Sequence, residues 1–134
     1  MTDDDVPPTL NFTYFGAPWC GPCVQMQPIF DETVIDFRRI SRRNGLEEFA
    51  DAITGVVVDT EADPETADEF DVDRLPTILV FLDDDEALRL VGARPKLDIR
   101  ERVSTVLGER WQTWAKAEDT GRRVTDPQSE PGPE

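Results

Sequence analysis

The chain of 134 residues contains no histidine. This absence excludes Ser-His-Asp triads, Cys-His nucleophile pairs, zinc sites built on imidazole, and imidazole acid–base catalysis. No apolar run approaches the roughly 20 residues of a membrane-spanning helix. The start, Met-Thr-Asp-Asp-Asp, lacks the basic residues and apolar stretch of a signal peptide. We therefore expect a soluble, cytoplasmic protein, whose length suits one domain.

Positive charge is also scarce. Lys and Arg together number 14 against 29 Asp and Glu, so the net charge is −15. Such a charge repels nucleic-acid phosphates and anionic lipid headgroups, and we expect neither nucleic acid nor a membrane as a partner. An acidic surface can bind a basic partner or mimic DNA. Alternatively, it can be an adaptation to high salt. The acids are spread through every segment and only Lys96 and Lys116 are lysines, which favours salt adaptation.

The two cysteines, Cys20 and Cys23, are separated by two residues in the sequence Ala-Pro-Trp-Cys-Gly-Pro-Cys. They follow an apolar, strand-like run and precede a helix-like one. Cys20 would lie at the N-terminus of that helix, where free N–H groups favour a thiolate, and Pro22 fits the first helical turn. Cys23, one turn further in, could attack a mixed disulfide on Cys20. The pattern predicts a nucleophilic and a resolving thiol.

Other interpretations of the two cysteines have less support. A structural disulfide across two residues closes a small loop and is unusual in a reducing cytosol. A zinc site needs four ligands, and two thiols without histidine are too few. A metal or iron–sulfur cluster bridging two chains is the remaining alternative. We favour redox chemistry and predict no metal site and no bound cofactor.

Residues 12–36 resemble the active-site segment of thioredoxins, and further motifs follow in the family's order. They are Pro28, five residues beyond Cys23; Val56-Val57-Val58-Asp59; Leu75-Pro76-Thr77; and Leu90-Val91-Gly92-Ala93. The resemblance covers roughly residues 9–107. It implies an α/β thioredoxin-like fold with a cis bond before Pro76. It also implies reduction of protein disulfides through Cys20 and Cys23, with electrons from a separate reductase of the thioredoxin reductase type.

The resemblance implies a substrate-binding surface around Cys20. In the family, the backbone before the cis proline pairs with an extended substrate segment, and Leu75 takes that position here. The implied apolar groove is rimmed by Trp19, Leu75, Pro76 and Gly92, together with Gly21 and Pro22 between the cysteines. Gly-Pro between the cysteines is typical of the reducing members, so we expect a reductase.

Two positions depart from the family pattern. The buried acid six residues before the first cysteine is replaced by Tyr14, and we align the lysine that accompanies it with Gly55. Without these groups, the proton of Cys23 would leave to water or through the Tyr14 hydroxyl as a proton relay. We expect slower resolution of the mixed disulfide and retained activity.

The predicted fold is a four-stranded mixed sheet flanked by helices, without the first strand and helix of the family. Residues 1–8, an acidic and proline-containing segment, are too few to supply them. The expected strand order is 55–59, 9–15, 77–82, 87–91, with the first pair parallel and an acidic turn at 83–86. The expected helices are 21–43, an inserted 46–53, a helical turn near 64–70, and 96–116. Strand 55–59 would be an exposed edge with three valines, covered by the insert or by another chain. We expect the insert to cover it.

Four regions are expected along the chain. Residues 1–8 form an acidic N-terminal segment, 9–107 the thioredoxin-like domain, 108–118 a helical extension, and 119–134 a flexible tail. We expect Trp111 and Trp114 to fold back on the core, the alternative being a partner-binding patch. Two alternative functions stay open: a glutaredoxin-like reductase, and a thioredoxin-fold interaction subunit with little or no redox activity.

Overall fold

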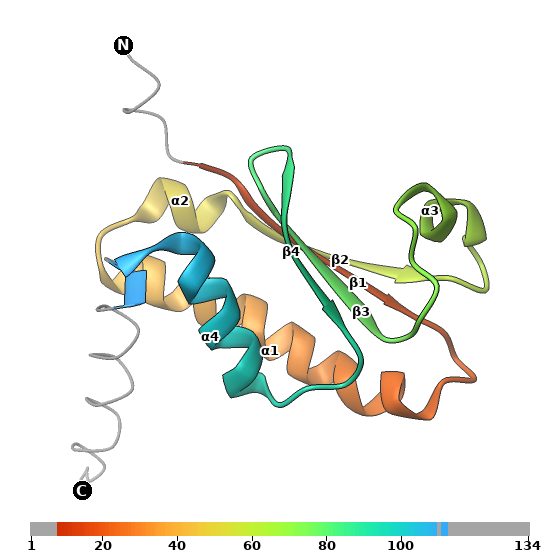
Figure 1. Ribbon diagram of the computed structural model, residues 1–134. Coiled ribbons are helices and arrows are strands. Elements are labelled where there is room, and N and C mark those ends of the chain that lie inside the picture. Colours follow the sequence, from red (N-terminus) through yellow and green to blue (C-terminus); the bar gives the residue numbers. More distant parts are fainter. Residues whose placement is uncertain (1–7, 110, 113–134) are drawn as a thin grey trace, which may run out of the picture.

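A four-stranded mixed sheet lies at the centre of the computed structural model, which describes residues 8–109 and 111–112 (Figure 1). Its elements are β1 (Leu10–Gly16), α1 (Gly21–Arg43), α2 (Glu47–Asp51), β2 (Ile53–Asp59), α3 (Pro64–Glu69), β3 (Thr77–Leu82), β4 (Asp85–Val91) and α4 (Lys96–Leu107). The strand order is β2-β1-β3-β4, parallel between β1 and β2 and antiparallel elsewhere. The predicted order and fold class are confirmed.

The two faces of β1 build two separate cores, which is why this strand is apolar almost throughout. Phe12 and Tyr14 point into the larger core beneath α1 and α4, whereas Phe15 packs with Val58 and Ala67 on the α3 side. Figure 1 shows α1 and α4 on one side of the sheet and α3 on the other. Burial on both faces holds β1 rigidly, and the loop that leaves its C-terminal end leads directly to the cysteines.

Helix α1 spans the residues predicted for it. Its buried stripe includes Met26, Phe30, Val34, Phe37 and Ile40 at helical spacing. The helix ends at Arg43, where Asn44 is the C-cap and Gly45 adopts φ +77°. A single long helix therefore carries Cys23 near its start and packs against the core along its whole length, as far as Ile40.

Three predicted boundaries need correction. Ile53 pairs with Leu10 and is buried, so β2 begins where we predicted the end of the inserted helix. Asp85 and Glu86 belong to β4 instead of the turn, because a bulge at Val80/Phe81 shifts the β3–β4 register. Helix α4 ends at Leu107, since Gly108 adopts φ +106°.

Trp111 belongs to the core. It is 4% exposed and stacks on Phe37 with ring centroids 5.2 Å apart, while Phe49 meets it edge-on at 6.1 Å. The expectation that Trp111 folds back is confirmed, and a partner-binding patch at this residue is wrong. Trp114 and residues 119–134 lie outside the described residues.

The predicted cover over the edge of the sheet is wrong. Helix α2 stays at the C-terminal end of α1, where Arg42 forms ion pairs with Glu47 at 3.5 Å and with Asp51 at 3.0 Å. Phe49 also anchors α2 against Trp111. Val56 and Val57 of β2 are left 46% exposed each.

Two absences hold for the part of the chain that the structure describes. No helix there is long and apolar enough to cross a membrane. The described residues also contain no group of three or more carboxylate or thiol side chains placed to hold a metal ion.

Candidate active site

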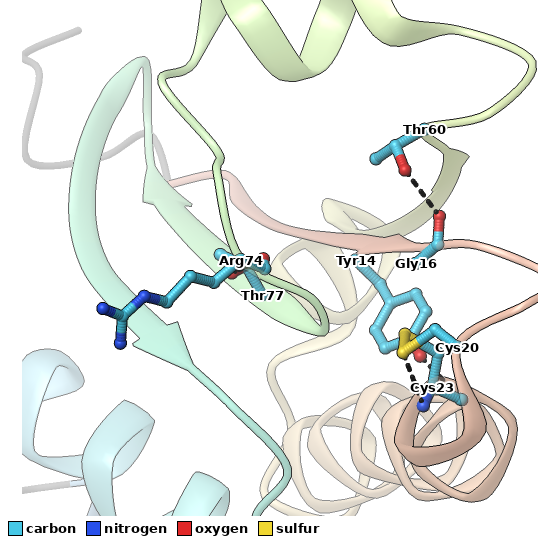
Figure 2. Close-up of a disulfide and its surroundings, with 7 residues drawn as sticks. All are labelled: Tyr14, Gly16, Cys20, Cys23, Thr60, Arg74 and Thr77. Atoms are coloured by element: carbon cyan, nitrogen blue, oxygen red, sulfur yellow. Dashed lines mark hydrogen bonds between the residues drawn. A yellow bond between two sulfur atoms is a disulfide. The ribbon is translucent and has the colours of Figure 1, made fainter.

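Cys20 and Cys23 lie at the N-terminus of α1 and are joined as a disulfide, with their Cα atoms 5.2 Å apart (Figure 2). Cys20 is the N-cap residue, and its Sγ accepts a hydrogen bond from the backbone N–H of Cys23 at 3.2 Å. The first turn of α1 contains no acidic residue. In the reduced protein, the same N–H and the positive end of the helix favour a thiolate at Cys20.

The two sulfurs sit below an exposed apolar rim. Cys20 and Cys23 are 6% and 4% exposed, whereas the neighbouring Trp19 is 69% exposed. Gly21 and Pro22, between the cysteines, are also exposed. A large aromatic surface left in solvent beside a buried disulfide can contact a macromolecular substrate.

The cis peptide bond predicted before Pro76 is present. Leu75 packs against the cluster of buried residues that contains both cysteines. The N–H of Gly92, which adopts φ +95°, donates to the carbonyl of Pro76 at 2.8 Å. Next to this turn, the Thr77 hydroxyl donates to the carbonyl of Arg74 at 2.7 Å (Figure 2). The structure thus ties Pro76 to Gly92 and places Leu75 against the core that contains the cysteines.

Tyr14 lies directly beneath the first turn of α1. Its hydroxyl donates to the backbone carbonyl of Cys23 at 2.7 Å, and its ring packs on Phe30. Burial, and secondarily the negative charge of Asp31, raise the pKa of Tyr14 to about 12. The hydroxyl is therefore protonated at neutral pH, and its proton is directed to a carbonyl instead of the sulfur of Cys23. A proton relay through Tyr14 stays a prediction, and this bond favours a positioning role.

Gly16 makes room for Tyr14. A Cβ atom at Gly16 would lie 2.8 Å from Cε1 of the tyrosine ring and 3.3 Å from Cβ of Cys23. Sequence reasoning did not select Gly16. The available signal was a glycine at the end of an otherwise apolar strand, which often marks a close approach.

A cavity of about 160 Å³ opens beside Cys23. Its lining includes Tyr14, Gly16, Cys23, Gln27, Val57 and Asp59. Gly55 is elsewhere: a Cβ atom there would contact Val34 and Phe30. Val57, which pairs with Tyr14 between β1 and β2, lines the cavity and Gly55 does not; the alignment of the family's lysine with Gly55 stays a prediction. Gln27 and Asp59, also missed from the sequence, bring polar side chains to this cavity.

The comparisons with known proteins agree with this geometry. The family model described as Thioredoxin matches residues 8–105. The chain belongs to the thioredoxin family. It is 31% identical to the thioredoxin of Staphylococcus saprophyticus over 101 residues, which cover 75% of this chain and 86% of that protein. It is 32% identical to the thioredoxin of Mycobacterium tuberculosis over 93 residues, covering 69% of this chain and 70% of that protein.

Solved thioredoxin structures share the fold. Chloroplastic thioredoxin z superimposes with a TM-score of 0.57 at 23% identity, covering 73% of this chain and 78% of that one. The thioredoxin NaTrxh from Nicotiana alata gives a TM-score of 0.56 at 26% identity, covering 71% and 70%. Membership in the thioredoxin family, together with the Cys20–Cys23 pair, supports a thiol–disulfide oxidoreductase.

Proposed function

We propose that this thioredoxin-family protein reduces disulfide bonds in other proteins, with Cys20 as the nucleophile and Cys23 as the resolving thiol. The observation that carries the proposal is the position of Cys20 at the N-cap of α1, where its sulfur accepts the N–H of Cys23. A thiolate is the reactive form of cysteine, and this position stabilises it.

The reaction consists of two thiol–disulfide exchanges. The Cys20 thiolate attacks one sulfur of the substrate disulfide, a mixed disulfide forms, and the other substrate sulfur leaves as a thiolate that takes up a proton. Cys23 then loses its proton and attacks the sulfur of Cys20. The substrate's second sulfur leaves, takes up a proton, and the Cys20–Cys23 disulfide remains. Two electrons have passed to the substrate, and a separate reductase of the thioredoxin reductase type would return them.

The proposed substrate groove combines the exposed face of Trp19 with Gly21, Pro22, Leu75, Pro76 and Gly92. Among the described residues, neither the N–H nor the C=O of Leu75 has a hydrogen-bond partner. An extended substrate segment could pair with these two groups as a short added strand. This supports the substrate as a protein segment that places its disulfide next to Cys20.

The cavity beside Cys23 supplies the proposed route for its proton. Gln27 and Asp59 line this cavity with Cys23, so water there could carry the proton to the surface. Tyr14 would act as a positioning residue, because its hydroxyl holds the carbonyl of Cys23. An interaction subunit without redox activity has less support now that Trp111 lies in the core.

The test is turnover of a protein disulfide by the full chain and by two serine variants. Cys20→Ser should abolish turnover and form no mixed disulfide. Cys23→Ser should also lose turnover but should accumulate a covalent complex with the substrate, because Cys20 can attack and nothing releases it. A Cys20→Ser variant that still reduces the substrate would contradict the proposed mechanism.

A further inference from the structure

Strand β2 forms an edge of the sheet at which apolar side chains gather. Val56 and Val57 are each 46% exposed, and Ile35 on the adjoining face of α1 is 57% exposed. A groove of about 370 Å³ runs between α1 and β2, and its lining includes Asp31, Ile35, Arg38, Gly55 and Val57. Exposed apolar surface on an edge strand favours association with another strand.

The register shows which backbone groups of β2 face outward. Leu10 N–H donates to the carbonyl of Ala52 at 3.2 Å, and Thr60 N–H donates to the carbonyl of Gly16 at 2.9 Å. Successive residues of a parallel strand alternate in the side to which they bond. The even-numbered residues 52–60 therefore bond toward β1, and the odd-numbered ones direct their N–H and C=O groups away from the sheet.

Both ends of this outward edge are occupied. The carbonyl of Ile53 accepts a hydrogen bond from Nε of Arg38 at 2.9 Å. At the other end, the carbonyl of Asp59 accepts the N–H of Asp63 at 2.8 Å. Between them, the N–H and C=O groups of Gly55 and Val57 have no partner among the described residues. The open edge is a window of four backbone groups.

We propose that a second copy of this chain pairs with this window, so that two sheets join through antiparallel β2 strands. A two-fold axis through Val56 places Gly55 of each copy opposite Val57 of the other. Each of these two pairs exchanges both of its backbone hydrogen bonds, so all four open groups in each copy are satisfied. The window is thus complementary to itself, as an interface between identical copies must be.

The side chains around the window fit the same register. Val56 meets its own counterpart across the axis, which buries two half-exposed valines against each other. Arg38 lies at the level of Ile53, which is opposite Asp59 of the second copy. Arg38 of one copy and Asp59 of the other therefore lie at the same level at both ends of the interface, and their charges are opposite. Apolar contact lies at the centre and charge complementarity at the rim.

The opposite edge of the sheet, β4, lacks these properties. It carries charged Asp85, Glu86 and Arg89 and follows the bulge at Val80/Phe81. Arg89 binds Glu86 through Nε at 2.9 Å and also donates to the carbonyl of Phe70 at 2.7 Å. Charges and bulges of this kind discourage edge pairing, whereas β2 has no charged residue between Ile53 and Val58. Because β1 separates β2 from β3, pairing at β2 leaves the Leu75–Pro76 turn outside the interface.

The test is sedimentation velocity of the oxidised full chain at about 0.1 M and about 1 M salt, where the Debye length falls from about 10 Å to about 3 Å. Both cysteines are in the intramolecular disulfide, so a doubled mass cannot come from an intermolecular one. We expect a monomer–dimer equilibrium that strengthens with salt, because each copy carries a charge of −15. Amide exchange at Gly55 and Val57 should slow as protein concentration rises.

Two lysine substitutions distinguish association through this interface from nonspecific association. Val56→Lys sets two like charges against each other across the axis and should raise the dimer dissociation constant by about tenfold or more. Leu97→Lys, at a 60% exposed position on α4, should leave it unchanged. A chain that stays monomeric at high salt, or a dimer that tolerates Val56→Lys, would overturn the proposal. Protection of Gly55 and Val57 that is independent of concentration would also overturn it, since another part of the same chain would then cover the edge.

Discussion

The hydroxyl of Tyr14 donates a 2.7 Å hydrogen bond to the backbone carbonyl of Cys23. A buried side chain of β1 thereby holds the first turn of the helix on which both cysteines sit. The family resemblance implies a buried acid at the position that Tyr14 occupies. Here a neutral donor takes its place and acts on the backbone instead of on a sulfur atom.

Removal of this hydroxyl should weaken the first turn of α1. Tyr14→Phe keeps the ring and its packing on Phe30 but leaves a buried carbonyl without this donor. We expect the free energy of unfolding to fall by about 1 kcal/mol, as for a typical lost hydrogen bond, with slower resolution of the mixed disulfide. Denaturant unfolding and single-turnover kinetics measure the two effects. A positioning role predicts the same slowing at every pH, whereas a relay predicts an altered pH profile, and an unchanged rate would exclude both.

The raised pKa of Tyr14 predicts a loss of stability in alkali. Burial favours the protonated phenol in the folded state, so its pKa is about 12 against 10.0 for an exposed tyrosine. The folded state then binds more protons than the unfolded state between these values, and stability falls as pH rises from about 10 to about 12. Unfolding measured across this range should show a slope that Tyr14→Phe reduces. The same slope in both proteins would contradict the assignment.

Gly16 and Tyr14 should behave as a coupled pair. Gly16→Ala introduces a Cβ atom 2.8 Å from the tyrosine ring, and we expect a cost of about 1–3 kcal/mol in unfolding free energy. Combination with Tyr14→Leu should cost less than the sum of the two single substitutions, because the clash with the ring is removed. Gly21→Ala is the matched control, since a Cβ atom there meets nothing within 4 Å. Additive costs would show that the close approach does not limit position 16.

Truncation of Trp111 should lower stability, whereas truncation of Trp19 should lower activity. Trp111→Ala removes a ring stacked on Phe37 in the core and should cost about 3–5 kcal/mol of stability. Trp19→Ala removes a ring that is 69% exposed, so stability should change little while kcat/KM for a protein disulfide falls. Thermal unfolding and steady-state turnover of both variants provide the comparison. Equal losses of stability would contradict the burial of Trp111.

High salt should stabilise the monomer. A chain with net charge −15 repels itself in the compact state, and raising the salt from about 0.1 M to about 1 M shortens the range of that repulsion. We expect the unfolding temperature to rise over this interval at fixed pH, measured below the concentration at which copies associate. A flat or falling unfolding temperature would argue against salt adaptation.

The sequence predicted most of the fold because its motifs, from Cys20 through Leu75-Pro76 to Gly92, occur in the order typical of the thioredoxin family. It failed where tertiary contacts outweigh local preference. The segment from Phe49 to Ile53 has a helical pattern, yet Ile53 pairs with Leu10, and this pairing sets the register of β2. The strand was therefore predicted to begin two residues too late, and the position of Val57 beside the cavity at Cys23 depends on the pairing seen in the structure. The fit of Gly16 against Tyr14 depends on three-dimensional contact, for which the sequence offers only a weak local signal.

The bond between the Gly92 N–H and the Pro76 carbonyl has a consequence for selectivity. It fastens the turn before β3 to the loop after β4, so two walls of the proposed groove keep their spacing without help from a bound segment. Conformational entropy lost on docking would then come mainly from the incoming polypeptide. Proteins whose disulfides lie in already extended, solvent-accessible stretches would be favoured over those that must unravel structure to fit.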